Sequence, residues 1–275
     1  MAFVIFGFEW RQDAGEAGLK VRRAFQQIRL VLPKIVILGV ILAVTVVLFL
    51  HFSPNPVSHI RIKFLDRTED VDMYAFAYLI YEINKLQRNW YFEIDFDVFK
   101  PDSLTSRQRD SCAADRNSQL CYAETLAAGK PLIGLTAKSL GEDSFWQNRG
   151  TVSVISTYGW KDFAPPSAYE FLSYSTVVQS IVIHLNAHCK GLPAGSFEEK
   201  SVAYGDIFQY SPRRTEMKAA ILGGHLNPKG EELLFNCFGL DYMTKAAKLL
   251  ELDWLRSKNV VRNLQKAFHV NDLGE

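Results

Sequence analysis

The most prominent pattern of apolar positions is an uninterrupted run from Ile35 to Phe52, which contains no acidic or basic side chain. At about 1.5 Å rise per residue, a helix of this length covers a hydrocarbon core of roughly 30 Å. A buried helix of a globular protein would carry a polar stripe, and this run has none. More than thirty residues precede it and no small-residue cleavage pattern follows, which favours an uncleaved anchor over a signal peptide. The pattern therefore predicts a transmembrane helix over residues 35–52.

The segment before this run, residues 1–34, has apolar residues spaced by three and four among charged ones, which is typical of an amphipathic helix at a membrane surface. Basic residues are more frequent before the run than after it, and those before it are Arg11, Lys20, Arg22, Arg23, Arg29 and Lys34. An excess of Lys and Arg marks the cytoplasmic side of a span. We therefore expect a single-pass protein of the inner cell membrane, in contact with the lipid bilayer, with its N-terminus inside and its C-terminal domain extracytoplasmic.

Beyond a Pro-containing linker at residues 53–58, the pattern changes to that of a globular domain over residues 59–275. Alternating apolar and polar residues predict two strands, His59–Leu65 and Trp90–Phe99, and helical spacing predicts a helix between them, Met73–Arg88. Two shorter strands are expected further on, at Lys130–Thr136 and Thr151–Thr157. The polar stretch between residues 100 and 129 is expected to be a loop with one helical piece.

Helical patterns dominate the rest of the chain. Ser167 is a suitable N-cap for a long helix that runs to about Cys189. Four shorter helices are expected after it, at Met217–Gly223, Lys229–Phe238, Tyr242–Trp254 and Val260–Phe268. The predicted fold class is α/β, with a mixed sheet, a long helix and a helical C-terminal tail, preceded by one N-terminal transmembrane helix.

Charge and cysteine content narrow the possible partners. The formal net charge is +1 and no dense basic stripe occurs, which argues against nucleic acid as a partner. Cys112 and Cys121 flank a short polar segment; they are either a disulfide of an extracytoplasmic domain or two unrelated thiols. Cys189 and Cys237 have apolar neighbours and are expected to be buried thiols. The sequence contains no CxxC spacing, which argues against a thiolate zinc site.

Two histidines near the end of the long helix are the main candidates for chemistry. His184 and His188 are four residues apart, so they lie on one helical face, the spacing by which a helix presents two imidazoles to one zinc ion. Zinc peptidases use this spacing as H-E-x-x-H, in which the Glu is the general base. Leu185 occupies that position here and cannot accept a proton. The alternative is that the two imidazoles serve packing or favourable contact with the helix C-terminus.

The order of elements before this helix resembles the zincin fold, in particular the archaemetzincin and metzincin type of metallopeptidase. In that family a strand, a helix, a strand, an edge strand and the active-site helix follow in this order. The resemblance covers roughly residues 59–195, with Thr151–Thr157 in the place of the substrate-binding edge strand and Gly191 at the family's turn. Ala194 stands where the extended motif has its third His. The resemblance implies a degenerate active site, lacking both the base and one ligand.

Two functions follow from these observations. In the first, the domain is a binding or sensing module without a cofactor, which holds a protein or peptide partner through an edge strand and a helix groove. In the second, it is a divergent membrane-bound zinc metallohydrolase, in which Glu198 completes a zinc site with His184 and His188. Glu199 and Asp206 are alternative third ligands, although acidic residues in a loop most often form a solvated surface. The sequence leaves open whether the protein is an enzyme.

Overall fold

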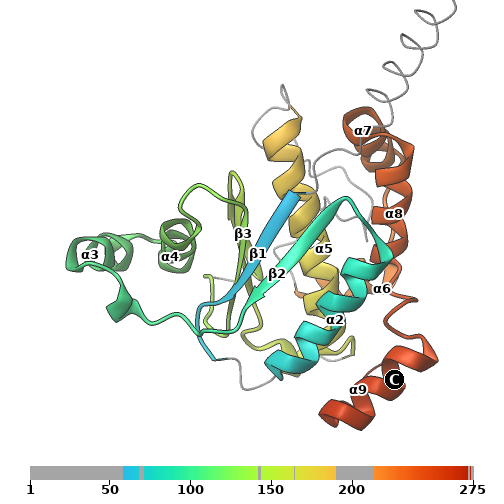
Figure 1. Cartoon of the computed structure of the whole chain (residues 1–275), viewed down its shortest axis with the longest axis horizontal. Helices are drawn as coiled ribbons and strands as arrows, with labels where there is room; N and C mark the ends of the chain where they lie inside the picture. Colours follow the sequence, from blue (N-terminus) through green and yellow to red (C-terminus); the bar gives the residue numbers. More distant parts are fainter. Residues whose placement is uncertain are drawn as a thin grey trace, which may run out of the picture. The chain divides into compact units, whose positions relative to one another are not determined.

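The computed structural model describes residues 58–67, 71–141, 144–163, 165–189, 214–271 and 273. All of them belong to one compact unit, Pro56–Glu275. This unit is a mixed α/β domain, as the pattern of strands and helices predicts (Figure 1).

A five-stranded sheet with the order β2-β1-β3-β5-β4 forms the centre of the domain. The strands are β1 (Ser58–Phe64), β2 (Trp90–Asp95), β3 (Leu132–Thr136), β4 (Trp146–Arg149) and β5 (Val152–Ser156). β1 pairs in parallel with β2 and β3, and β3 pairs in parallel with β5. β4 is antiparallel to β5 and forms one edge of the sheet, while β2 forms the other.

The connections place helices on both faces of the sheet (Figure 1). α2 (Met73–Leu86) connects β1 to β2 and begins at the N-cap Asp72. α3 (Ser106–Ala114) and α4 (Ser118–Ala127) connect β2 to β3, after a short 3-10 turn at Pro101–Ser103. The chain after β5 passes through a second 3-10 turn at Trp160–Phe163 into the long helix α5, and four shorter helices end the domain: α5 (Ala168–His188), α6 (Arg214–Gly223), α7 (Pro228–Phe238), α8 (Leu240–Leu250) and α9 (Lys258–Phe268).

Two hydrophobic clusters, one on each face of the sheet, follow from the alternation of side chains along the strands. Ile60 and Ile62 of β1 face the larger cluster, which also contains residues of α2, α5 and the C-terminal helices. Val152 and Val154 of β5 face the smaller cluster, which they form with Leu120 and other residues of α4. Because α4 packs on β3 and β5, the smaller cluster lies under one half of its face of the sheet.

Every residue of α5 from Ala168 to Leu185 is buried. The helix packs against β5 and α2 as well as α6 and α8, so it has protein on all sides. Its first turn is fixed by a capping box, in which Ser167 and Glu170 each bond to the other's backbone N–H. The buried Glu170 carboxylate also accepts a hydrogen bond from Arg256 Nε at 2.9 Å, which attaches the segment after α8 to the start of α5.

The predicted fold class needs one correction, concerning the membrane. No helix in the described ranges is both long enough and apolar enough to cross a membrane. The run Ile35–Phe52, on which that expectation was based, lies outside the described residues, as do segments 1–34 and 53–57. The fold class that the structure supports is therefore the mixed α/β domain alone.

Two further expectations about elements are wrong. Thr151–Thr157 contains the inner strand β5 rather than an edge strand, because Trp146–Arg149 pairs beside it as β4. The stretch between residues 100 and 129 holds two helices in place of a loop with one helical piece. A capping box at Thr105 and Gln108 begins α3, and this S/T-x-x-E/Q pattern was visible in the sequence.

We predict that Arg256→Met lowers the free energy of unfolding by about 2–3 kcal/mol, because it leaves the Glu170 carboxylate buried without its cation. On a Glu170→Gln background the same substitution should cost less than about 1 kcal/mol, since no buried charge remains. Urea unfolding of the four proteins in this cycle measures both values. Arg262→Met is the control, because Arg262 bonds to Asn259 at the surface. Equal losses on the two backgrounds would contradict the role given to the ion pair.

Candidate functional site

The two candidate histidines lie at the end of α5, where burial stops. His184 is 4% exposed, whereas His188, one turn later, is exposed. Their ring centroids are 5.8 Å apart and the rings are nearly perpendicular. The predicted helical face is therefore correct, and it places one ring inside the domain and the other at its surface.

The His184 ring is held by aromatic neighbours. Its Nδ1 lies 3.0 Å from the hydroxyl of Tyr242 in α8. Trp90 of β2 meets the ring edge to face at 5.5 Å between centroids, and Phe238 lies at 6.0 Å. The Nε2 atom is buried and has no hydrogen-bond partner among the residues that the structure describes. His184 thus connects α5 to the first residue of β2 and to α8.

Burial determines the protonation states of His184 and Tyr242. Desolvation, with the nearby His188 as a smaller cause, lowers the pKa of His184 to about 4. Desolvation also raises the pKa of Tyr242 well above its usual value. Both groups are therefore neutral at neutral pH, and the hydrogen bond between them joins an uncharged imidazole to an uncharged phenol.

The description of this domain as metallopeptidase-like needs correction. The described ranges contain no group of three or more His, Cys, Asp or Glu side chains that could hold a metal ion. His184 and His188 are adjacent, but Glu198, like Glu199 and Asp206, lies outside the described residues. Within the part of the chain that the structure describes, the pair contributes to an aromatic cluster.

One of the two sheet edges is closed by side-chain amides. Both backbone groups of Phe92 in β2 bond to the Asn84 side chain, at 2.9 Å each. The backbone N–H and C=O of Trp90 bond in the same way to Gln87, at 3.1 and 2.8 Å. The backbone N–H and C=O groups of residues 90 and 92 point away from β1. The end of α2 therefore occupies the positions where an added strand would pair with β2.

The other edge, β4, lacks such closure. Its hairpin with β5 has a two-residue turn, with Gly150 at a positive φ of 59° where a type II′ turn favours glycine. The closing pair Arg149–Val152 and the bond from Ser156 N to Phe145 O place residues 145, 147 and 149 toward β5. The backbone N–H and C=O groups of Trp146 and Asn148 therefore point away from β5.

The outward groups of β4 are mostly unpaired. Trp146 O accepts a hydrogen bond from the Ser144 hydroxyl at 2.8 Å. For Trp146 N–H and for both backbone groups of Asn148, no partner occurs among the described residues. The end of α5 lies beside this edge, because Asn186 Nδ2 donates to Gly150 O at 2.9 Å. The exposed β4 edge and the helix end that carries His188 are thus joined by a direct contact.

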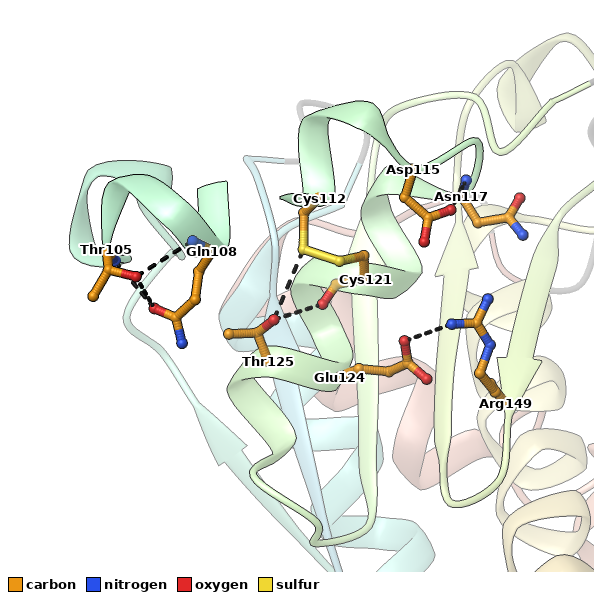
Figure 2. The surroundings of a disulfide bond; sticks show 9 residues. All are labelled: Thr105, Gln108, Cys112, Asp115, Asn117, Cys121, Glu124, Thr125 and Arg149. Carbon is orange, nitrogen blue, oxygen red and sulfur yellow. Dashed lines mark hydrogen bonds and ion pairs between the residues drawn. A yellow bond between two sulfur atoms is a disulfide. The ribbon is translucent and has the colours of Figure 1, made fainter. Parts of the chain in front are cut away.

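Two disulfides cross-link the domain. Cys112 of α3 and Cys121 of α4 are bonded, with Cα atoms 5.3 Å apart, and Figure 2 shows this bond beside Thr125 and the Glu124–Arg149 ion pair. Of the two alternatives left by the sequence, the structure has the disulfide. The second pair, Cys189 and Cys237, joins the residue after α5 to α7. The expectation of buried free thiols for that pair is wrong.

No family model, no curated protein and no solved structure matches this chain.

The low pKa of His184 predicts a pH-dependent stability. The unfolded chain binds a proton at this residue below its ordinary pKa of 6.5, whereas the folded chain binds one only near 4, so stability is lost as the pH falls through this window. We expect this residue to contribute a loss of about 2 kcal/mol between about pH 8 and about pH 5.

Urea unfolding at the two pH values measures this contribution. The pH-dependent loss should shrink by that amount in His184→Gln and should be unchanged in the control His225→Gln, whose imidazole is exposed. An identical pH dependence in wild type and His184→Gln would show that His184 is not buried in its neutral form.

Proposed function

We propose that this domain is a binding module that accepts an extended segment of a partner protein as an additional strand beside β4. The observation that supports this most directly is the difference between the two sheet edges. Side-chain amides of α2 and its C-cap satisfy the outward groups of Trp90 and Phe92 on β2. The outward groups of Asn148 on β4 have no such partner among the described residues.

Unpaired backbone groups at a sheet edge are a template for another chain, and natural proteins close the edges they do not use. A partner strand beside β4 would accept hydrogen bonds from the N–H groups of Trp146 and Asn148 and would donate one to the Asn148 carbonyl. Each bond contributes a net stabilisation of about 0.5–1.5 kcal/mol. Three bonds alone give weak binding, so side-chain contacts of the partner with the two faces of the sheet must supply the remainder.

The side chains on either side of β4 indicate which partner would fit. Gln147 and Arg149 lie on the face covered by α4, where Gln147 bonds to Asn117 and Arg149 pairs with Glu124. Trp146 packs against the larger cluster on the α5 face. A strand added here would thus have polar neighbours on one face, and an indole ring and the end of α5 on the other. This favours a partner segment of alternating polar and apolar residues.

We further propose that the domain works in an oxidising compartment outside the cytoplasm. All four cysteines of the chain are paired. Disulfides persist in secreted and periplasmic proteins and are rare in the cytosol, where thiols are kept reduced. The extracytoplasmic location expected from the sequence is the same, and it stays a prediction.

The strand-addition proposal can be tested by replacing one backbone donor. Peptides selected from a random display library on the full-length protein should bind Asn148→Pro at least tenfold more weakly, because proline removes the outward N–H. The stability of this variant should change little, since that N–H is not part of the ladder with β5. Asn148→Val, which keeps the N–H, should bind as wild type does.

Hydrogen exchange identifies the surface in the same experiment, because a bound strand should slow exchange at Trp146 and Asn148. Protection at β2 instead, or equal peptide affinity for the Pro and Val variants, would exclude β4 as the binding edge.

The compartment proposal predicts that both disulfides are present in the native full-length protein. After denaturation without reductant, no cysteine should react with a maleimide. A Cys112→Ser, Cys121→Ser variant should lose about 2–3 kcal/mol of stability, as expected for a disulfide that closes a short loop. Four reactive thiols in protein isolated from its native location would place the domain in a reducing compartment.

A further inference from the structure

A pocket of about 400 Å³ lies on the outer face of β1 and β2, at the opposite end of the sheet from β4. Ile60 and Ile62 of β1 face the larger cluster, so the alternating residues Arg61 and Lys63 lie on the opposite face of the sheet, here called the outer face. Their partners on β2, Glu93 and Asp95, lie on the same outer face. The lining consists of the end of β2 and one residue of β1: Arg61, Glu93, Ile94, Asp95, Phe96 and Asp97.

This part of the sheet is open because the helices of that face lie over the other half. α4 packs on β3 and β5. It reaches β1 through the carbonyl of Leu126, which accepts a hydrogen bond from the Arg61 guanidinium. Tyr91 and Glu93 of β2 are exposed. The pocket is therefore a region of the sheet that no described helix covers.

The charges of the pocket do not balance. Lys63 Nζ pairs with Asp95 Oδ2 at 2.7 Å. Partial burial alone would raise the pKa of Asp95, but the Lys63 bond and the Asp97 backbone N–H outweigh it and lower that pKa. Glu93 and Asp97 form no ion pair with a described residue, and the other cation of the lining, Arg61, bonds to the Leu126 carbonyl. Arg61 and Lys63 together offset two of the three carboxylates, which leaves one negative charge. The lining therefore has a net negative charge and would complement a cationic group.

The lining contains one aromatic residue, Phe96. Phe96 lines the pocket and stacks on Tyr74 of α2, with centroids 5.4 Å apart and an interplanar angle of 24°. Phe96 is 44% exposed and Tyr74 is 66% exposed. Exposed aromatic side chains are enriched at protein interfaces. A planar guanidinium can stack on such a ring and also form paired hydrogen bonds with a carboxylate, whereas an ammonium group cannot do both in this way.

We propose that this pocket binds an arginine side chain presented by a partner protein. Glu93 and Asp97 receive the guanidinium, and Phe96, supported by Tyr74, covers its flat face. This site is separate from the β4 edge, so each can be tested without the other.

The probe is a labelled peptide of glycine and serine with one central arginine, compared with the same peptide containing citrulline, the uncharged counterpart of arginine. Titrated against the full-length protein at low salt, the arginine peptide should bind at least tenfold more tightly. Glu93→Gln, Asp97→Asn should remove most of this difference. Phe96→Ala should weaken the arginine peptide about threefold or more.

Glu232→Gln, Asp253→Asn is the matched control, because it removes the same charge at exposed positions elsewhere and should leave the difference intact. Asn148→Pro should also leave it intact, which separates this site from the β4 edge. Thermal melting of each variant verifies folding. Equal affinity for the arginine and citrulline peptides, or an arginine preference that survives the Glu93 and Asp97 substitutions, would overturn the proposal. A lysine peptide that binds as tightly as the arginine peptide would overturn the guanidinium assignment.

Discussion

The burial of α5 is the constraint on which the rest of this domain depends. A helix that is buried along Ala168–Leu185 needs protein on every side, and the sheet can cover only one of them. α2 and the later helices α6 and α8 pack against α5 and supply the other sides. The C-terminal helices are thus an integral part of the fold, because they cover the side of α5 that faces away from the sheet.

Polar residues inside this helix show how it is fixed in position. The Ser153 hydroxyl of β5 donates a hydrogen bond to Gln179 Oε1 at 2.6 Å, which fixes the position of α5 along the sheet. Glu170 bonds to both the helix start and Arg256. At the other end, His184 contacts Trp90 and Tyr242. These contacts are specific in a way that apolar packing alone is not, because each polar group is buried and has few alternative partners.

The sequence predicts those elements of the fold that have a strong hydrophobic periodicity or a clear helix cap. Ser167 was recognised as an N-cap because a side-chain oxygen at that position serves the first turn whatever lies around it. The strand β4 was missed because Trp146–Arg149 is only four residues long and mostly polar, and its pairing with β5 depends on a turn rather than on alternation. Local patterns do not carry that information.

The candidate site was harder to predict, for a related reason. Spacing placed His184 and His188 on one helical face, but it does not reveal whether a ring meets a metal or a tryptophan. That depends on Trp90 and Tyr242, each more than fifty residues away in the sequence. The pairing of Cys189 with Cys237 was missed on the same grounds, since a separation of 48 residues gives no sign of contact. In contrast, Cys112 and Cys121 are close enough in sequence for a disulfide to be considered.

The two proposed surfaces differ in chemistry but are attached to the same helix. At β4, the hairpin turn bonds to Asn186 and the neighbouring strand bonds to Gln179, both of α5. At the pocket, Tyr74 belongs to the first turn of α2, and the N-cap Asp72 donates its backbone N–H to the Tyr169 hydroxyl of α5 at 3.0 Å. A buried helix moves little on its own, because displacing it would disturb every layer around it. The fold therefore holds an edge that offers backbone hydrogen bonds and a face that offers charge and aromatic contact in a fixed relation. This arrangement suits the recognition of one partner at two separate points.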